Sequence, residues 1–206
     1  EEVEAARRAA LERFAAAGLE EPLRARLRRP PAARGDACHQ VLPGLWLGGC
    51  AALGEDCAEL RRRRVTHVVS VLSAERRRLP AFVRGHLHVR VDDTEAAAPE
   101  LAERFPEICR FLEAARGEPR GCAFVHCGAG ISRAPTAVAS YVMWALGMPA
   151  AAALQVVRAA RPSVRPNLGF VRQLRAWELR MRQLPGCGHA AAGPGGGAGR
   201  ARGPAR

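Results

Sequence analysis

The chain has 206 residues, which is enough for one domain of about 150 residues with additional segments at its ends. Its hydrophobic content of 48% can build one core, yet no apolar stretch is long and uncharged enough to span a bilayer. Seven cysteines without a CxxC pair argue against a zinc site and against a secreted disulfide framework. We therefore expect a reducing compartment, the cytoplasm with the nucleus as a further location.

The formal net charge of +12 comes from arginine alone, because the chain contains no lysine. Two arginine clusters stand out, Arg61–Arg64 on a predicted helix and Arg76–Arg78 on a connecting turn. A basic surface steers acidic partners and holds nucleic acid weakly, without sequence preference. No recognised nucleic-acid motif accompanies the clusters, so we expect no specific nucleic-acid partner and interpret both clusters as solvated faces.

Three segments differ in composition along the chain. Residues 1–38 form an N-terminal extension, with an amphipathic helix predicted over 2–17 and a flexible joint over 30–37, where two prolines and a glycine occur. Residues 39–184 form the predicted domain. The tail, residues 185–206, is dominated by glycine, alanine, proline and arginine without periodicity, and we expect it to be disordered.

Within the domain, short apolar runs alternate with longer segments of helical periodicity. The expected elements are a hairpin near 41–47, a helix near 55–63, strands at 67–72 and 86–91, a helix at 100–115, a strand at 122–126, and helices at 134–146, 149–160 and 169–182. This alternation predicts an α/β fold with a largely parallel central sheet that helices cover on both faces.

The most informative stretch is HCGAGISR at residues 126–133, which places Cys127 and Arg133 six positions apart across a glycine-rich turn. A loop that wraps an anion must point successive N–H groups inward, and Gly128 and Gly130 permit the positive φ angles that this requires. Arg133 can close the ring with a planar fork that matches two phosphate oxygens. The residues expected to bind a substrate anion are Gly128, Ala129, Gly130, Ile131, Ser132 and Arg133.

The flanking segments indicate that this motif is an anion-binding site and not a chance match. A buried strand is predicted before the loop and a buried helix after it, so the loop lies at the carboxyl end of a central strand. The amino end of that helix favours negative charge, including the thiolate form of Cys127. The alternative, in which Cys127 is only a small buried hydrophobic residue, is less consistent with this context. Cys122 is interpreted as a core cysteine, with a resolving thiol as the alternative.

These residues resemble the signature of the cysteine-dependent protein phosphatases, in which His-Cys is followed by five residues and an arginine. The chain is most similar to the small, atypical dual-specificity branch, over roughly residues 39–182. Residues 40–48 (QVLPGLWLG) resemble the opening hairpin, 65–72 (VTHVVSVL) the first central strand and 161–174 (RPSVRPNLGFVRQL) the closing helix. The resemblance implies a single-domain dual-specificity phosphatase-like fold and phosphorylated proteins as partners.

The resemblance also implies a role for each site residue. Cys127 attacks phosphorus and forms a phosphocysteine, while Arg133 and the loop amides hold the phosphate oxygens. His126 orders the loop. Asp93 is the expected general acid, with Asp92 and Glu95 as alternatives, because Asp93 requires a loop two residues longer than usual. No metal or cofactor enters this scheme.

Two further positions complete the prediction. Asn167 is expected to support the phosphate loop through hydrogen bonds to its backbone, or alternatively to cap the following helix. Ala134 stands where most family members have a serine or threonine, whose hydroxyl helps the thiolate leave in the second step. Its absence predicts slow phosphocysteine breakdown, which Ser132 and Thr136 can partly compensate.

The resemblance leaves alternative functions open. One is a pseudophosphatase that binds phosphoproteins without turnover, and the other is a phosphatase for RNA, lipid or glycan phosphates. Uncharged residues at the variable loop positions Gly128, Ala129 and Ile131 argue against inositol lipids.

Overall fold

A computed structural model describes residues 37–54 and 56–183 of the chain. The predicted N-terminal helix over 2–17 and the predicted disordered tail over 185–206 lie outside the described residues. Across the described ranges, each helix is too short or too polar to act as a membrane span.

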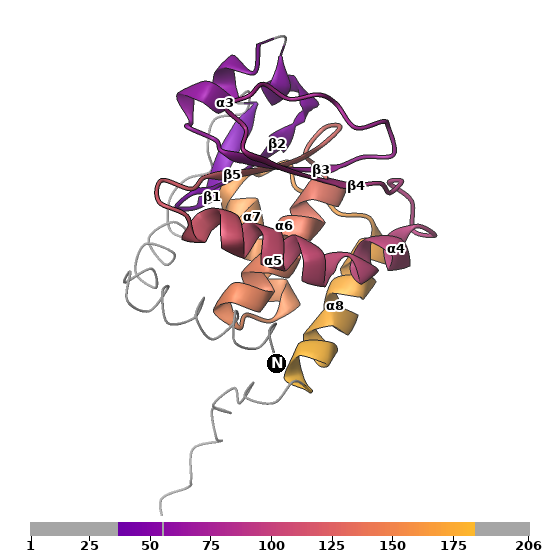
Figure 1. The fold of residues 1–206 in the computed structure, drawn as a ribbon. Coiled ribbons are helices and arrows are strands. Elements are labelled where there is room, and N and C mark those ends of the chain that lie inside the picture. Colours follow the sequence, from indigo (N-terminus) through magenta and orange to yellow (C-terminus); the bar gives the residue numbers. More distant parts are fainter. Residues whose placement is uncertain (1–36, 55, 184–206) are drawn as a thin grey trace, which may run out of the picture.

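Five strands form one sheet in the order β1-β2-β5-β3-β4 (Figure 1). The strands are β1 (Cys38–Leu42), β2 (Leu45–Gly49), β3 (His67–Val71), β4 (Gly85–Val89) and β5 (Ala123–Cys127). β1 and β2 form the predicted antiparallel hairpin, and β2, β5, β3 and β4 pair in parallel. The prediction of a largely parallel sheet in an α/β fold is confirmed.

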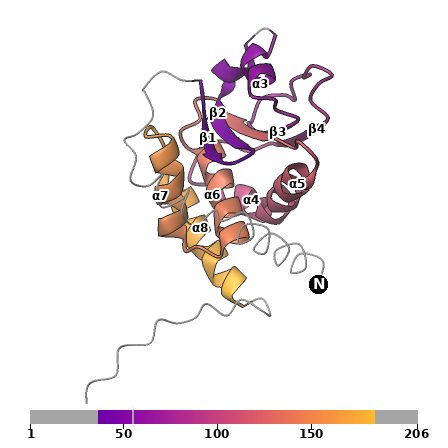
Figure 2. The ribbon, with the colours of Figure 1, turned by 90° about the vertical axis from the view of Figure 1, so that its left-hand side faces the viewer.

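Helices cover both faces of this sheet. The helices are the 3₁₀ helix η1 (Cys50–Leu53), α3 (Ala58–Arg62), α4 (Ala98–Glu103), α5 (Phe105–Gly117), α6 (Arg133–Leu146), α7 (Ala150–Ala160) and α8 (Leu168–Arg182). Figures 1 and 2 show α3 on one side of the sheet and α4 to α8 on the other. In this larger layer, α4 and α5 precede the loop at residues 128–132 along the chain, and α6 to α8 follow it.

The single helix predicted at 100–115 is wrong, because two helices, α4 and α5, occupy this segment. Pro106 lies in the first turn of α5, where its missing N–H costs nothing. In the interior of one continuous helix, the same ring would clash with the carbonyl of Ala102. The chain therefore ends α4 at Glu103 and restarts at Phe105.

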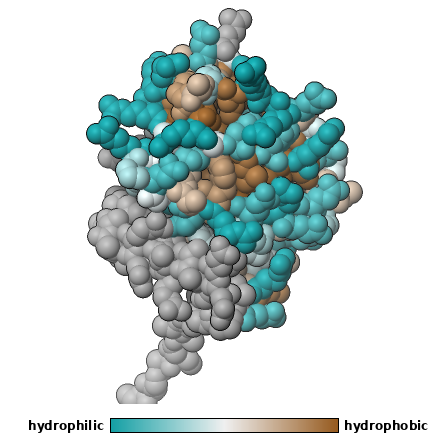
Figure 3. Space-filling model, viewed as in Figure 1, coloured by the Kyte–Doolittle hydropathy of each residue, from teal (hydrophilic) through white to brown (hydrophobic). Residues whose placement is uncertain are grey.

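Two apolar clusters fill the spaces above and below the sheet. The larger one is centred on α6, whose residues 134–145 are all buried, as the apolar composition of this helix predicts. The smaller one lies under η1 and α3 and includes Leu60, Val68 and Phe124. On the face drawn in Figure 3, hydrophilic side chains surround the hydrophobic ones that remain visible. Burial on both sides holds β5 rigidly, and β5 ends at the cysteine of the predicted site.

Candidate active site

The predicted strand, loop and helix are all present around Cys127. β5 ends at Cys127, the loop covers residues 128–132, and α6 begins at Arg133. The Cys127 side chain is buried, and the loop is joined to the end of β2 by a 2.8 Å hydrogen bond from the Cys50 amide to the Gly128 carbonyl. The neighbouring parallel strands thus end together and place the loop at the carboxyl edge of the sheet.

The two loop glycines have different roles. Gly130 has φ +69°, and a Cβ built there would lie 2.4 Å from the backbone of Gly48. Gly128 lacks a positive φ, and a Cβ there would meet only the Nη2 of Arg133 at 3.7 Å. The expectation that both glycines adopt positive φ angles is therefore wrong for Gly128, because close approach to β2 restricts only Gly130.

The carbonyl oxygens of the loop accept hydrogen bonds from residues that lie outside the loop, in the segment that follows α7. Arg161 donates from Nη2 to the Ala129 carbonyl and from Nε to the Gly130 carbonyl, both at 3.0 Å. The amide of Arg165 donates to the Ile131 carbonyl at 2.8 Å. Among the described residues, no acceptor binds the backbone amides of residues 129–132. Carbonyls held outward and amides without protein acceptors are the arrangement that an anion-binding loop requires.

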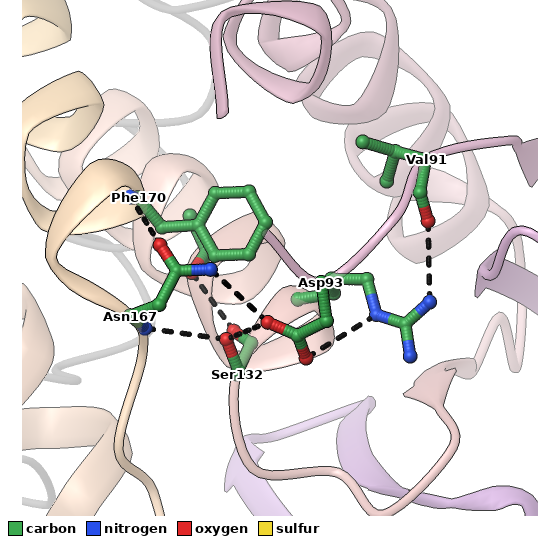
Figure 4. A network of polar contacts seen from close by, with 7 residues as sticks. Val91, Asp93, Ser132, Asn167 and Phe170 are labelled. Atoms are coloured by element: carbon green, nitrogen blue, oxygen red, sulfur yellow. Dashed lines mark hydrogen bonds and ion pairs between the residues drawn. The ribbon is translucent and has the colours of Figure 1, made fainter. Parts of the chain in front are cut away.

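Arg133 lies across this loop and is oriented by the protein backbone. Its Nη1 donates to the Val91 carbonyl at 3.1 Å, and its Nε lies 3.4 Å from Asp93 Oδ2 (Figure 4). The Nε atom is buried without a hydrogen-bond partner among the described residues. The carbonyl of Val91 therefore fixes the guanidinium plane, while the Nε edge remains able to donate to an anion.

Asp93 is the acidic residue that the structure brings to the loop. Its Oδ1 accepts a 2.6 Å hydrogen bond from the Ser132 hydroxyl and a 3.1 Å bond from Asn167 Nδ2 (Figure 4). All three candidates are exposed, but Asp92 has no side-chain hydrogen bond or ion pair with the described residues, and Glu95 pairs with Arg172 of α8. The segment that carries the three acidic candidates, residues 92–95 (the acid loop), thus contacts the catalytic loop, residues 128–132, through Asp93.

Asn167 caps the following helix, which is one of its two expected roles, but among the described residues it makes no hydrogen bond to the backbone of the loop. Its Oδ1 accepts a 2.9 Å bond from the Phe170 amide and caps α8, while its own amide donates to Ser132 Oγ at 3.3 Å. Its side-chain nitrogen contacts Asp93 rather than the backbone of the loop. Asn167 therefore couples the start of α8 to the acid loop.

His126 belongs to a chain of polar side chains on the sheet. Arg76 Nε donates to His86 Nδ1 at 3.3 Å, Ser70 Oγ lies 2.8 Å from His86 Nε2, and the same oxygen lies 2.7 Å from His126 Nε2. Because a guanidinium only donates, His86 Nδ1 accepts and its Nε2–H donates to Ser70, whose hydroxyl then donates to His126. The remaining proton of the His126 ring lies on Nδ1, which is 3.7 Å from the sulfur of Cys50.

Desolvation keeps both histidines of this hydrogen-bonded chain, His86 and His126, neutral. Desolvation lowers the pKa of His126 to about 4, and desolvation together with the charge of Arg76 lowers the pKa of His86 to about 4. A neutral ring fixed on both sides suits a structural role beside Cys127. The sequence indicated His126 alone; Ser70 and His86 were missed, although a serine inside a buried apolar strand is a detectable signal.

The other cysteines differ in their relation to Cys127. Cys122 packs in the smaller cluster, and its sulfur lies 3.6 Å from the Arg63 carbonyl, whereas Cys127 belongs to the larger cluster on the other side of the sheet. The position of Cys122 thus fits a core cysteine. Burial raises the pKa of Cys50, and the charge of Cys127 raises it further. In the described part of the chain, no three His, Cys, Asp or Glu side chains form a metal-binding group.

The two loop glycines generate a matched test. Gly130→Ala should lower the free energy of unfolding by about 2 to 4 kcal/mol, because it combines a strained φ with a clash against β2. Gly128→Ala, with an open Cβ position and a negative φ, should cost about 1 kcal/mol or less. Urea unfolding of both variants measures this difference, and equal losses would contradict the assigned conformations.

The neutral histidines predict a pH dependence of stability. Lowering the pH from 6.5 to 5 protonates these groups in the unfolded chain but not in the fold, so the free energy of unfolding should fall. The slope is at most about 1.4 kcal/mol per pH unit for His126, and smaller for the more exposed His86. His67, whose pKa burial also lowers, acts in the same direction.

Urea unfolding at several pH values measures this slope, with His126→Gln as the comparison. The variant should show a shallower dependence, because one of the groups that titrates only in the unfolded chain is removed. A wild-type stability that is constant between pH 6.5 and 5 would show that these rings are not held neutral.

Comparisons with known proteins agree with this geometry. The model of the dual specificity phosphatase catalytic domain matches residues 45–180. Dual specificity protein phosphatase 22 of Mus musculus is 35% identical over 144 residues, which cover 70% of this chain and 75% of the relative. Dual specificity protein phosphatase 26 of Bos taurus is 31% identical over 195 residues, which cover 83% of this chain and 91% of the relative.

A solved structure shares the fold as well as the sequence. The crystal structure of human DUSP28 matches with a TM-score of 0.63 and 31% identity, and the match covers 75% of this chain and 99% of that one. The resemblance detected in the sequence is thereby confirmed. The chain belongs to the family of dual specificity phosphatases, which are cysteine-dependent protein phosphatases.

Proposed function

We propose that this phosphatase hydrolyses phosphotyrosine and phosphoserine or phosphothreonine in proteins through a phosphocysteine intermediate. The observation that carries the proposal is the loop itself: it follows Cys127 directly, its backbone amides at residues 129–132 meet no acceptor in the described part of the chain, and it leads to Arg133, whose Nε is buried without a hydrogen bond there. Those donors match a phosphate group in charge and in number of acceptors.

In the first step, the sulfur of Cys127 attacks phosphorus and forms an S–P bond while the P–O bond to the side-chain oxygen breaks. The loop amides and Arg133 stabilise the equatorial oxygens as charge shifts. Asp93 donates a proton to the departing oxygen.

In the second step, water attacks the phosphocysteine and the S–P bond breaks, which releases inorganic phosphate and restores the thiolate. Asp93 now accepts a proton from the water. Ser132 and Asn167 hold the carboxylate through Oδ1, so that Oδ2 faces Arg133 and the reacting groups. His126 takes no proton in this scheme, because its buried ring is neutral and engaged by Ser70.

The loop supports a protein substrate with either type of phosphorylated side chain. Gly128, Ala129 and Ile131 add no charge around the phosphate, and Ile131 is 38% exposed at the surface. An exposed apolar rim suits a peptide better than a polyanionic inositol headgroup. A rim at the surface also admits the short side chains of phosphoserine and phosphothreonine.

The second step should be slow, because the hydroxyls near Ala134 are already engaged. Ser132 donates to Asp93, and Thr136 donates to the Ser132 carbonyl at 2.8 Å. Neither is therefore available to stabilise the leaving thiolate. A missing charge-assisted hydrogen bond costs roughly 1.5 to 3 kcal/mol, or about one to two powers of ten in rate.

Kinetics with p-nitrophenyl phosphate tests the slow step. The wild type should release a burst of p-nitrophenol equivalent to the enzyme concentration before the steady state. Ala134→Ser should raise kcat by about tenfold and diminish the burst, because the added hydroxyl stabilises the leaving thiolate. Absence of a burst in an active wild-type enzyme would refute the slow second step.

Substitution of the acid and the nucleophile tests the chemistry. Cys127→Ser should abolish turnover, and Asp93→Asn should lower kcat for a phosphotyrosine peptide by about 10² to 10⁴. The loss should be smaller for p-nitrophenyl phosphate, whose leaving group needs less protonation. Asp92→Asn and Glu95→Gln are the matched controls and should retain activity.

The outcomes separate the alternatives. A loss in Asp92→Asn or Glu95→Gln that exceeds the loss in Asp93→Asn would reassign the general acid. A wild type that binds phosphopeptides but hydrolyses neither substrate would be a pseudophosphatase. Hydrolysis of RNA ends, lipid phosphates or glycan phosphates in preference to phosphopeptides would overturn the substrate class.

A further inference from the structure

The loop between β3 and β4 forms a cavity that the proposed chemistry does not use. Its volume is about 430 Å³, and it is lined by four arginines, by His86 and by two apolar side chains. The arginines are Arg76, Arg77, Arg78 and Arg84. The first three are the cluster that the sequence analysis interpreted as a solvated face. In the structure they line a concave site.

The charge of this cavity is largely uncompensated. Arg76 donates to the carbonyl of His86 at 3.0 Å and to its neutral ring, and Arg77 donates to the Gly54 carbonyl at 2.6 Å. Within the described ranges, no carboxylate lies within 4.0 Å of Arg76, Arg77 or Arg78; only Arg84 has such a partner, Glu118 at 3.0 Å. Neutral acceptors thus fix two guanidinium groups without cancelling their charge, which favours binding of an anion.

The cavity is physically connected to the catalytic loop. Arg76, His86, Ser70 and His126 follow one another in three side-chain contacts of 2.7 to 3.3 Å, and His126 precedes the nucleophile. The charge of Arg77 also acts on Cys50, which is hydrogen-bonded to the catalytic loop. β3 and β5 are neighbouring parallel strands, so the arginine loop begins at the edge where the catalytic loop lies. Arg77 binds the carbonyl of Gly54 at the end of η1, and the amide of Cys50 at the start of η1 binds Gly128 in the catalytic loop. A 3₁₀ helix of 4 residues rises only about 2 Å per residue, so a few residues of extended peptide, at about 3.3 Å each, can bridge the two sites.

We propose that this cavity is a second anion subsite, which binds a carboxylate or phosphate on the same peptide as the target phosphoresidue. The proposal rests on the proposed function, because it assumes a peptide in the catalytic loop. The arginines supply the donors for the anion, and Leu79 and Val83 contact the apolar part of the side chain that carries it. The subsite directs the enzyme to phosphoresidues with acidic or phosphorylated neighbours.

Binding to the Cys127→Ser protein tests the subsite without turnover. Three fluorescein-labelled phosphotyrosine peptides differ only at the positions two to four residues away on both sides, which carry glutamate, phosphoserine or glutamine. Fluorescence anisotropy should show about five- to tenfold tighter binding of the glutamate and phosphoserine peptides than of the glutamine peptide. Equal affinities for all three would overturn the subsite.

Paired variants locate the effect. Arg77→Gln/Arg78→Gln should reduce the preference to about twofold or less, because the main donors are lost. Arg110→Gln/Arg175→Gln removes the same charge from exposed positions on α5 and α8 and should keep the full preference. An equal loss in both pairs would assign the effect to net charge and overturn the subsite, as would a preference that survives in the cavity variant.

Two further measurements keep the result interpretable. If the double variant unfolds, Arg78→Gln is the substitute, since this side chain has no hydrogen bond or ion pair with the described residues; it should still lower the preference by about threefold. Hydrolysis of the glutamine peptide by the wild type is measured in parallel. An acidic preference in binding without hydrolysis would refute the proposed function alone, and hydrolysis without a preference would refute the subsite alone.

Discussion

The active site depends on the orientation of one short stretch of backbone. Arg161 and the amide of Arg165 bind the carbonyl oxygens of the catalytic loop from outside, and Gly130 packs against Gly48 without a side chain between them. The amides then have no acceptor within the described protein. A loop with its donors fixed in advance requires no reorganisation as charge develops on phosphate, which is the main source of electrostatic catalysis.

The acid loop is bonded directly to the catalytic loop and to Arg133. Asp93 is held by a hydroxyl of the catalytic loop, by the amide of Asn167 at the start of α8 and by the charge of Arg133. Two segments far from Asp93 in sequence, residues 132–133 and Asn167, therefore set the position of its carboxylate. The same contacts engage the Ser132 hydroxyl, which explains why the absence of a hydroxyl at Ala134 has no evident replacement nearby.

The other side of the sheet links the site to its surroundings. The neutral rings of buried His126 and half-buried His86 are linked by hydrogen bonds to Ser70, and the hydrogen-bonded chain continues to Arg76 at the rim of a basic cavity. Neutral rings orient the neighbouring side chains through hydrogen bonds and add no charge beside the Cys127 thiol. The arrangement joins the rim of this cavity and the residue before the catalytic cysteine in one hydrogen-bonded system.

The family, the parallel sheet and the catalytic loop could be predicted from the amino-acid chain alone, because they follow from local signals: apolar periodicity, a glycine-rich turn and the spacing from Cys127 to Arg133. It also placed Asp93 among three candidates. The folded contacts were needed to show which carboxylate reaches the loop, that Gly128 needs no positive φ, and that Arg161 and Arg76–Arg78 belong to the site and its surroundings. Those contacts join residues on separate elements, and long-range packing leaves no periodicity or spacing in the chain from which they could be inferred.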